Sequence, residues 1–462
     1  MPSPSPSPRR ARTLALTVLG AVLGAVTVAG VGTAGVAVVM GDGYRAAPEA
    51  PPGGWPAPAP IPPGRTVVAV LAGATGSVAA DLLAPYEVFA RSPAFSVYTV
   101  AARRAPVPLS GGLHLLPDHT LAEVDAGTVP PPDVVVVPAV VEPAGGAEAP
   151  SREWITRQAA RGAHVLGVCA GTELLAESGV LDGRRATSFW ARIDALRRSR
   201  PEVGWDAGRR YVQDGPITTT AGVTSGIVGA LRLVEQLAGT GEVERIGREV
   251  AYPDWSPSAP TRIPENRLAL ADLPYALNAA FPWGRPSVAV GLADGVGEID
   301  VAAAFEVYSG TSFAARTIPV AAGRVVRTRH GAVLVAEPAG PDVTAVGRLV
   351  VPGVSHATGV SRELAGWAAG RGLRAELPHG GRGAGESGFD AVLRDLAAHA
   401  DRATARATAK FIEYPASHLR LTGTAWPWRS TALCVATVAA ALCAGLAPAL
   451  VARRRRRAAG QG

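Results

Sequence analysis

One cysteine of this chain stands where a nucleophile would be placed. Cys169 is the centre of a Gly-Val-Cys-Ala-Gly pentapeptide, residues 167–171, which follows a strand-like stretch, 163–166, and precedes a helical pattern that starts at Thr172. Two glycines between a strand and a helix predict a sharp turn that exposes its central side chain. The N-terminus of the following helix favours a thiolate. A buried, inert cysteine in a turn of small residues fits the same pattern.

The other two cysteines offer Cys169 no partner in an exported body. Cys434 and Cys443 both lie in an uncharged, apolar run near the C-terminus. An unpaired thiol on the oxidising side of a membrane is either a reactive group or a well-buried one. A reactive thiol is also what peroxide attacks, so redox sensing is a further interpretation.

Two uncharged runs, 13–40 and 430–451, are long enough to cross a membrane. A bilayer core of about 30 Å needs roughly 20 residues of helix. Three arginines precede the first run and five, 453–457, follow the second. The positive-inside rule therefore predicts a plasma-membrane protein with both termini in the cytoplasm and the body outside. The first run also resembles a cleaved secretory signal, but its length favours an uncleaved anchor.

The charge balance follows from this topology. The formal net charge is +7 at pH 7, and eight arginines flank the two apolar runs, so the rest of the chain is close to neutral. We therefore expect the membrane and a small-molecule substrate or ligand as partners, and no nucleic acid.

The body alternates strand-like and helical patterns. Residues 66–71, 95–100 and 133–137 are continuous apolar strands, and 81–91 reads as an amphipathic helix. Continuous apolar strands separated by helices indicate a mostly parallel sheet covered on both faces, so the fold class is α/β. The Pro-, Ala- and Gly-rich stretch 41–65 predicts a stiff, extended tether between the membrane and the body.

Segments of the body recur later in the chain. Residues 81–89 match 300–308 at an offset of 219. Further matches follow in order: Gly112 and Leu115 with Gly331 and Leu334 at 219, 136–138 with 350–352 at 214, Arg161-Gly162 with Arg371-Gly372 at 210, and Ser225-Gly226 and Tyr252-Pro253 with Ser387-Gly388 and Tyr414-Pro415 at 162. The series predicts a tandem duplication whose second copy has lost about 48 residues. We expect the copies to pack as an intramolecular pseudo-dimer.

The position of Cys169 falls on His379 in the second copy. Pro378 directly precedes His379, and the helix that should follow it lies in the missing stretch, so no equivalent turn is expected there. We expect His379 in a surface loop; a metal ligand or base is the alternative.

Four motifs together resemble a known family. They are Asp81-x-x-x-Pro85-x-Glu87-Val88-Phe89, the pentapeptide 167–171, Leu181-Asp182-Gly183-Arg184-Arg185-Ala186-Thr187 and Ala221-Gly222-Val223-Thr224-Ser225-Gly226. In this combination the chain resembles the ThiJ/PfpI (DJ-1/PfpI) family of the class I glutamine amidotransferase-like fold. Its closest subset is similar to isocyanide hydratase-like proteins and to the sensor domains of AraC-type regulators. Together with the repeat and the two apolar runs, the resemblance predicts two tandem flavodoxin-like, parallel-sheet domains, the second truncated, between two transmembrane helices.

The resemblance also implies the site. Cys169 would be the nucleophile, hydrogen-bonded to Asp81, which would hold the thiolate and carry a proton. The remaining candidates are turn and oxyanion positions and pocket residues: Gly167, Ala170, Gly171 and Ala139, then Thr187, Phe189 and Trp190. No cofactor and no metal are expected.

Three departures from the family pattern count against hydrolysis. Phe189 stands where the family usually has His, and Phe cannot take a proton. Ala139-Val140 replaces the usual glycines, and Ala170 replaces a hydroxyl residue. Losing one oxyanion donor typically costs roughly 10²–10³ in rate.

No other histidine is expected to substitute. His164 lies five residues before Cys169 on the same strand, which puts it about 16 Å away. His114 and His119 lie in a hairpin-like region that reaches the site only if the fold bends it there.

The sequence thus leaves two main functions open. One is a membrane-anchored cysteine-dependent hydrolase or hydratase for a small electrophile. The other is a non-catalytic binding or sensing module that keeps the pocket. The expected organisation is a cytoplasmic Arg-rich N-terminus 1–12, a transmembrane helix or signal anchor 13–40, a linker 41–65, a first domain 66–256, a linker 257–285, a degenerate second domain 286–416, a transmembrane helix 430–451 and a cytoplasmic tail 452–462.

Overall fold

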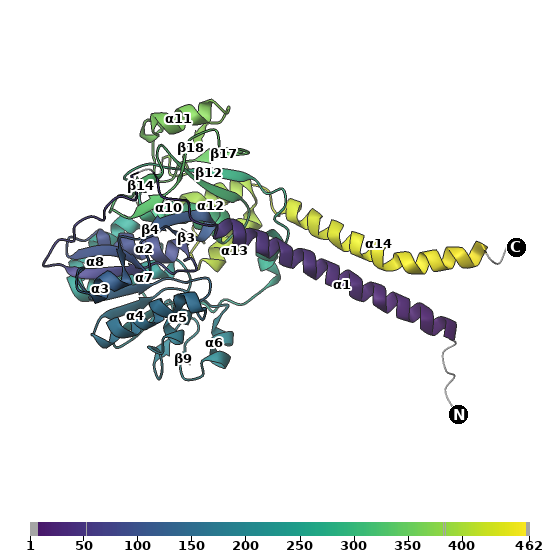
Figure 1. Ribbon diagram of the computed structural model, residues 1–462, viewed down its shortest axis with the longest axis horizontal. Helices are drawn as coiled ribbons and strands as arrows, with labels where there is room; N and C mark the ends of the chain where they lie inside the picture. Colours follow the sequence, from purple (N-terminus) through teal and green to yellow (C-terminus); the bar gives the residue numbers. More distant parts are fainter. Residues whose placement is uncertain (1–7, 52, 382, 384, 459–462) are drawn as a thin grey trace.

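Two long helices project from a body of packed sheets and helices (Figure 1). The structure is a computed structural model that describes residues 8–51, 53–381, 383 and 385–458, except for the side chains of 8–19, 21, 23 and 445–458. The projecting helices are α1 (Pro8–Gly43) and α14 (Trp428–Ala458), which lie side by side.

The first half of the body contains a seven-stranded sheet in the order β10-β11-β7-β6-β1-β2-β5. Every pair is parallel except β10 with β11. The strands are β1 (Thr66–Leu71), β2 (Phe95–Ala101), β5 (His119–Thr120), β6 (Val134–Val137), β7 (His164–Gly167), β10 (Tyr211–Asp214) and β11 (Ile217–Thr220). The central strands, β1 from Val67 onward and β6 throughout, are apolar because helices cover both faces. The predicted α/β class is confirmed.

One face of this sheet packs against α2 (Ala79–Ala90), α7 (Ser225–Ala238) and α8 (Thr240–Val250). The other face packs against α3 (Leu121–Asp125), α4 (Ala149–Ala160), α5 (Gly171–Glu177) and α6 (Ile193–Ser199). A small two-stranded sheet, β8 (Arg185–Ala186) with β9 (Gly204–Trp205), lies in the long connection between α5 and β10.

The second half contains a five-stranded parallel sheet in the order β16-β13-β12-β17-β18. Its strands are β12 (Ser287–Leu292), β13 (Arg316–Ala321), β16 (Glu337–Pro338), β17 (Arg348–Val350) and β18 (Ala375–Glu376). Its helices are α10 (Glu298–Phe305), α11 (Arg362–Ala369), α12 (Gly388–His399) and α13 (Arg402–Phe411). The strand order repeats that of β5, β2, β1, β6 and β7 in the first sheet.

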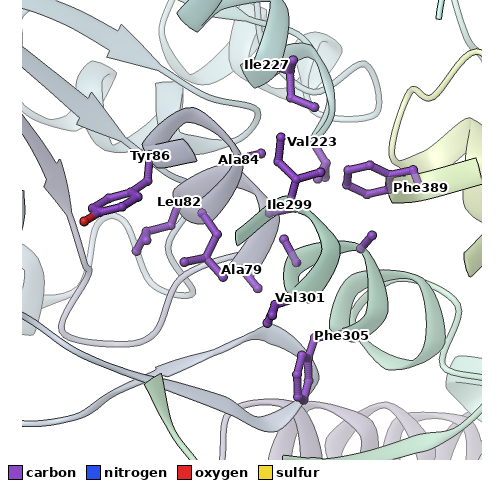
Figure 2. Close-up of a cluster of buried hydrophobic side chains, with 14 of the residues drawn as sticks. Ala79, Leu82, Ala84, Tyr86, Val223, Ile227, Ile299, Val301, Phe305 and Phe389 are labelled. Carbon is purple, nitrogen blue, oxygen red and sulfur yellow. The ribbon is translucent and has the colours of Figure 1, made fainter. Parts of the chain in front are cut away.

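The two halves share one hydrophobic core. Hairpins β3 (Val107–Leu109) with β4 (Leu113–Leu116), and β14 (Val325–Arg327) with β15 (Val333–Val335), join through β4 and β15 into a four-stranded sheet. In this pairing Leu115 lies opposite Leu334, its match at an offset of 219. Figure 2 shows the apolar side chains of α2, such as Leu82, beside those of α10, such as Val301.

The prediction of an amphipathic helix at 81–91 is wrong in one respect. All residues of α2 except Ala90 are buried. The face that would meet water in an isolated domain packs against α10, so the whole helix lies inside the core.

The segment after α1 lies along the body instead of standing off as a tether. The Arg45 side chain donates to the Thr317 carbonyl at 2.6 Å, and Ser96 donates to the Pro62 carbonyl at 3.1 Å. The predicted linker 257–285 contains α9 (Leu273–Ala280), which packs against α1 and α13.

Among the residues described, one segment, Gly24–Gly43 of α1, has the length and apolar composition to cross a membrane. The apolar part of α14, Trp428–Ala444, is shorter. Both predicted runs, 13–40 and 430–451, extend into positions whose side chains lie outside the description.

Candidate active site

Cys169 occupies the turn between β7 and α5, as the pentapeptide predicts. Its φ is 55°, in the left-handed region that a residue with a side chain rarely adopts. Gly171 allows the turn to approach β6 closely, because a Cβ there would lie 2.3 Å from the Val137 carbonyl oxygen. A strained residue at a strand-to-helix turn is a feature of functional sites.

The Cys169 side chain is enclosed. Its residue is 5% exposed, and its carbonyl oxygen accepts bonds from Thr172 Oγ1 at 2.9 Å and Ser188 Oγ at 3.2 Å. Burial, followed by the Asp81 carboxyl, raises the pKa of the Cys169 thiol well above its ordinary range, and the Ala170 N–H only partly opposes this. The expected thiolate is therefore not favoured; the resting group is a neutral thiol.

Asp81 lies in the first turn of α2 and is fully buried. Its Oδ2 accepts the Ala139 N–H at 3.1 Å, and its Oδ1 has no hydrogen-bond partner among the described residues. The expected hydrogen bond to Cys169 is therefore absent from the described contacts. Because burial raises the pKa of Asp81 well above its usual range, the neutral carboxyl is favoured, and it can donate a proton.

The residues predicted at the turn and the oxyanion pocket have different roles in the structure. The Ala139 N–H is engaged by Asp81, so it does not point to a reacting oxygen. The Ala170 N–H bonds to the Cys169 sulfur. Gly167 and Gly171 act through close packing, since a Cβ at Gly167 would lie 2.6 Å from the Leu175 side chain.

The three predicted pocket residues do not line one cavity. Thr187 and Trp190 line a cavity of about 410 Å³ together with Ser188. Phe189 lies instead beside Ala170 in a separate depression. Thr187 is held by bonds to Thr219 and to the Asp206 carbonyl, both 2.8 Å.

Three groups near the site that the sequence does not predict come from outside the first domain. Glu306, at the end of α10, accepts the Ser110 hydroxyl at 2.6 Å and raises the pKa of Cys169. Glu413, after α13, accepts the Gly222 N–H at 2.7 Å and acts on Cys169 in the same direction. The repeat contains a signal for Glu306, which matches Glu87, but none for the orientation of Glu413.

Tyr44, directly after α1, is the third of these groups. Its ring lies against the loop after β1, where a Cβ on Gly76 would come within 2.6 Å of Tyr44 Cδ1. Burial raises the pKa of Tyr44, and the Glu306, Asp81 and Cys169 groups add to this effect. The segment that leaves α1 thus covers the Cys169 site.

The prediction that His379 lies in a surface loop is wrong. His379 is 1% exposed; its Nδ1 accepts the Gly353 N–H at 3.1 Å, and its Nε2 lies 3.3 Å from Asp300 Oδ1 and 3.1 Å from the Gly388 carbonyl. Asp300 lies in the first turn of α10, as Asp81 does in α2. The turn after Pro378 folds inward because this carboxylate receives the imidazole.

The other histidines lie away from Cys169. His164 begins β7, at the opposite end of the strand from the turn. His114 Nε2 lies 3.1 Å from the Arg45 carbonyl, and the His119 ring packs edge-on to Tyr98 at 5.4 Å.

Two clusters in the described part of the chain hold carboxylates and a histidine within 4.8 Å: Glu87 with Glu298 and His330, and Glu376 with Asp395 and His399. Arg91 pairs with Glu87, and Arg348 pairs with Glu376 and Asp395. Both clusters are therefore ion-pair networks, in which an arginine side chain already pairs with at least one of the carboxylates.

Comparison with known proteins identifies the first half. The DJ-1/PfpI family matches residues 66–236. The chain is 35% identical over 197 residues to isonitrile hydratase of Pseudomonas putida, covering 39% of this chain and 80% of that protein. It is 32% identical over 142 residues to the HTH-type transcriptional regulator CdhR of Pseudomonas aeruginosa, covering 31% of this chain and 40% of the regulator. A crystal structure of a THiJ/PfpI family protein from Pseudomonas syringae is 28% identical, with a TM-score of 0.37 over 46% of this chain and 84% of that one. The chain belongs to the DJ-1/PfpI family.

Proposed function

We propose that this protein is a membrane-anchored hydratase or hydrolase that adds water to a small electrophile. Cys169 is the nucleophile and Asp81 the proton donor. The observation that carries the proposal is the strained Cys169 turn, which brings a thiol beside a buried carboxyl with an unpartnered oxygen. The similarity to isonitrile hydratase suggests an isonitrile as the substrate class.

A neutral thiol and a neutral carboxyl suit addition to an isonitrile carbon. In the first step the sulfur–carbon bond forms, the carbon takes the Asp81 proton, and Asp81 receives the thiol proton. The product is a thioimidate on Cys169, and Asp81 is again neutral. Because both groups are enclosed, no water competes with the transfer.

We infer that the second half arose by duplication and takes the place of a partner subunit. Its five strands follow the order of β5, β2, β1, β6 and β7, and Asp300 occupies the same helical turn as Asp81. The described part of the second half has no strands equivalent to β11 and β10. Glu306 and Glu413 of this half act on the Cys169 thiol, because both carboxyls raise its pKa.

Membrane anchoring by α1 and α14 is a further part of the proposal. Large apolar side chains of both helices face outward, among them Val26, Val36, Val435 and Leu442. Such a surface on two adjacent helices favours a lipid environment. With the flanking arginines, it supports cytoplasmic termini and an extracytoplasmic body.

Turnover of a small isonitrile tests the proposed reaction. The full chain, purified in detergent, is supplied with cyclohexyl isonitrile, and formation of the N-formyl amine is followed by chromatography. We expect product with the wild type and none above background with Cys169→Ser. Product formation by Cys169→Ser, or none by the wild type, would contradict the assignment.

A binding or sensing module is the second candidate function. The observation that favours it is the closed site, in which Cys169 is 5% exposed and Phe189 replaces a proton-carrying residue. Ligand binding without turnover would support this function. A redox role is disfavoured, because the raised pKa of Cys169 keeps the thiol neutral and slow to react with peroxide.

A further inference from the structure

We propose that Glu413, a residue of the second half, is the general base and acid that handles the protons of water at Cys169. The inference rests on the proposed hydratase function and extends it. Phe189 of the first half cannot carry a proton, so the second half supplies the group that does.

Glu413 is held at the site by unusual backbone geometry. It follows the C-terminus of α13 with a φ of 52°, which a non-glycine residue rarely adopts. Its Oε2 accepts the Gly222 N–H at 2.7 Å and lies 3.4 Å from Ser225 Oγ. A Cβ on Gly222 would lie 2.7 Å from Glu413 Cγ, so glycine at that position makes room for the carboxylate.

The first half also fixes the main chain on both sides of this carboxylate. The Thr224 N–H donates to the Ile412 carbonyl at 3.0 Å, and Thr224 Oγ1 lies 3.0 and 3.1 Å from the carbonyls of Ile412 and Glu413. The Tyr252 hydroxyl lies 3.3 Å from the Glu413 carbonyl. With its backbone clamped in this way, the carboxylate is oriented before any substrate arrives.

A cavity beside Glu413 extends to Ser188, which contacts the backbone of Cys169. The cavity of about 410 Å³ is lined by Glu413, Thr187 and Ser188, among others. Ser188 in turn bonds to the Cys169 carbonyl. Asp81 is fully buried, whereas Glu413 is 8% exposed. Of these two carboxyls, Glu413 is the one that borders the cavity, so we assign the step that uses water to Glu413 and the enclosed step to Asp81.

The charges around the site suit Glu413 to this role. Burial raises the pKa of Glu413 to about 7, while the Gly222 N–H, Arg210 and Ser225 hold it from rising further. Burial also raises the pKa of Asp81 and Glu306, the other acidic groups that act on Cys169. Glu306 accepts the hydroxyls of Ser110 and Thr311 and does not line the cavity. Glu413 lines the cavity and has a pKa near neutral, where a general base is most effective.

The reaction step balances as follows. Water oxygen bonds to the thioimidate carbon while one water proton moves to Glu413. The C=N electron pair moves to nitrogen, which takes that proton from Glu413. The carbon–sulfur bond then breaks, its electron pair returns to sulfur, and the remaining hydroxyl proton passes through Glu413 to sulfur. A formamide leaves, and Cys169 and Glu413 regain their starting states.

Two measurements on Glu413→Gln test the proposal, with Asp401→Asn as the matched control. Asp401 is also a buried carboxyl of the second half, but it caps the opposite end of α13. The first measurement is the pH dependence of Cys169 alkylation by iodoacetamide in the full chain. The second is turnover of cyclohexyl isonitrile.

We expect Glu413→Gln to shift the alkylation profile to lower pH by about one unit, because a negative charge beside the thiol is removed. We expect turnover to fall by about 10²-fold. Loss of the fold would also expose the buried thiol and speed its alkylation, so the unfolding temperature of Glu413→Gln must equal that of the wild type for both effects to be assigned to the carboxylate. Asp401→Asn should change neither quantity by more than about twofold.

An alkylation profile equal to that of the wild type would overturn the proposal, whatever happens to turnover. Unchanged turnover would overturn it as well. If the wild type shows no turnover but the profile shifts, the proposed hydratase function is wrong, and the coupling of Glu413 to Cys169 stands.

Discussion

The two halves place an aspartate in the same helical turn but satisfy it in opposite ways. In the second half Asp300 lies 3.3 Å from the imidazole of His379, which also bonds to the backbone of Gly353. In the first half Asp81 keeps one buried oxygen without a partner in the described structure, and Cys169 is strained. An unsatisfied buried polar atom costs about 1–3 kcal/mol. This cost persists in the half to which we assign the chemistry.

The two halves also differ at the residue that follows α8 in the first half and α13 in the second. Ala251 after α8 and Glu413 after α13 are related by the offset of 162, and both have a φ of 52°. The backbone conformation is the same, yet only the second half carries a carboxylate there. Each half therefore lacks a group that the other supplies: the thiol belongs to the first half and the water-side carboxylate to the second.

Substitution of the two aspartates should give the largest difference in activity between the halves. We expect Asp81→Asn to lower the turnover of cyclohexyl isonitrile by about 10³-fold, because the amide cannot deliver a proton to carbon. Asp300→Asn should leave turnover within about twofold. Equal losses in the two variants, at equal thermal stability, would show that Asp81 acts through the fold alone.

The free energy of unfolding should depend more on the second half than on the first. His379→Ala leaves the Asp300 carboxylate and the Gly353 N–H buried without the imidazole, so we expect a loss of about 3–5 kcal/mol. Cys169→Gly relieves the positive φ, so we expect it to be up to about 1 kcal/mol more stable than Cys169→Ala, which loses the same sulfur but keeps the Cβ. Thermal unfolding of the full chain measures all three variants. A Cys169→Gly variant less stable than Cys169→Ala would mean that the turn is not strained.

The sequence predicts those parts of the molecule that depend on local pattern. Apolar runs and glycines locate β1, β6 and the Cys169 turn, and the family motif locates Asp81. The errors concern contacts between distant segments. The outer face of α2 is buried because α10 covers it, and His379 is buried because Asp300 receives it; neither partner is adjacent in sequence.

The missed site residues have the same cause. Glu413 reaches Cys169 only because the second half packs on the first, and Tyr44 only because α1 ends at the junction of the two. Glu306 is different. It matches Glu87 in the repeat, so the sequence predicts its position on the helix but not that it faces the Cys169 site.

The pH dependence of the free energy of unfolding should show the titration of the Glu413 carboxyl. Its pKa rises from 4.5 to about 7 in the folded chain, so folding favours its protonated form. The stabilisation is complete below about pH 4.5 and is lost as the pH rises to about 7, by about 3 kcal/mol at most. Glu413→Gln should flatten this part of the pH profile of the unfolding temperature. A profile that keeps its slope would place the titrating group elsewhere.

The smallest expected effect concerns the cover over the site. Tyr44 directly follows α1, is half-buried and lies against the loop of Gly76 in the thiol-bearing half. Removing its ring in Tyr44→Ala should open a path to Cys169 and raise the rate of iodoacetamide alkylation several-fold. Tyr44→Phe, which keeps the ring and loses the hydroxyl, should alkylate at nearly the wild-type rate. If both variants react equally fast, the hydroxyl rather than the ring restricts access. The second half has no thiol to cover, because the buried His379 stands at the position that matches Cys169.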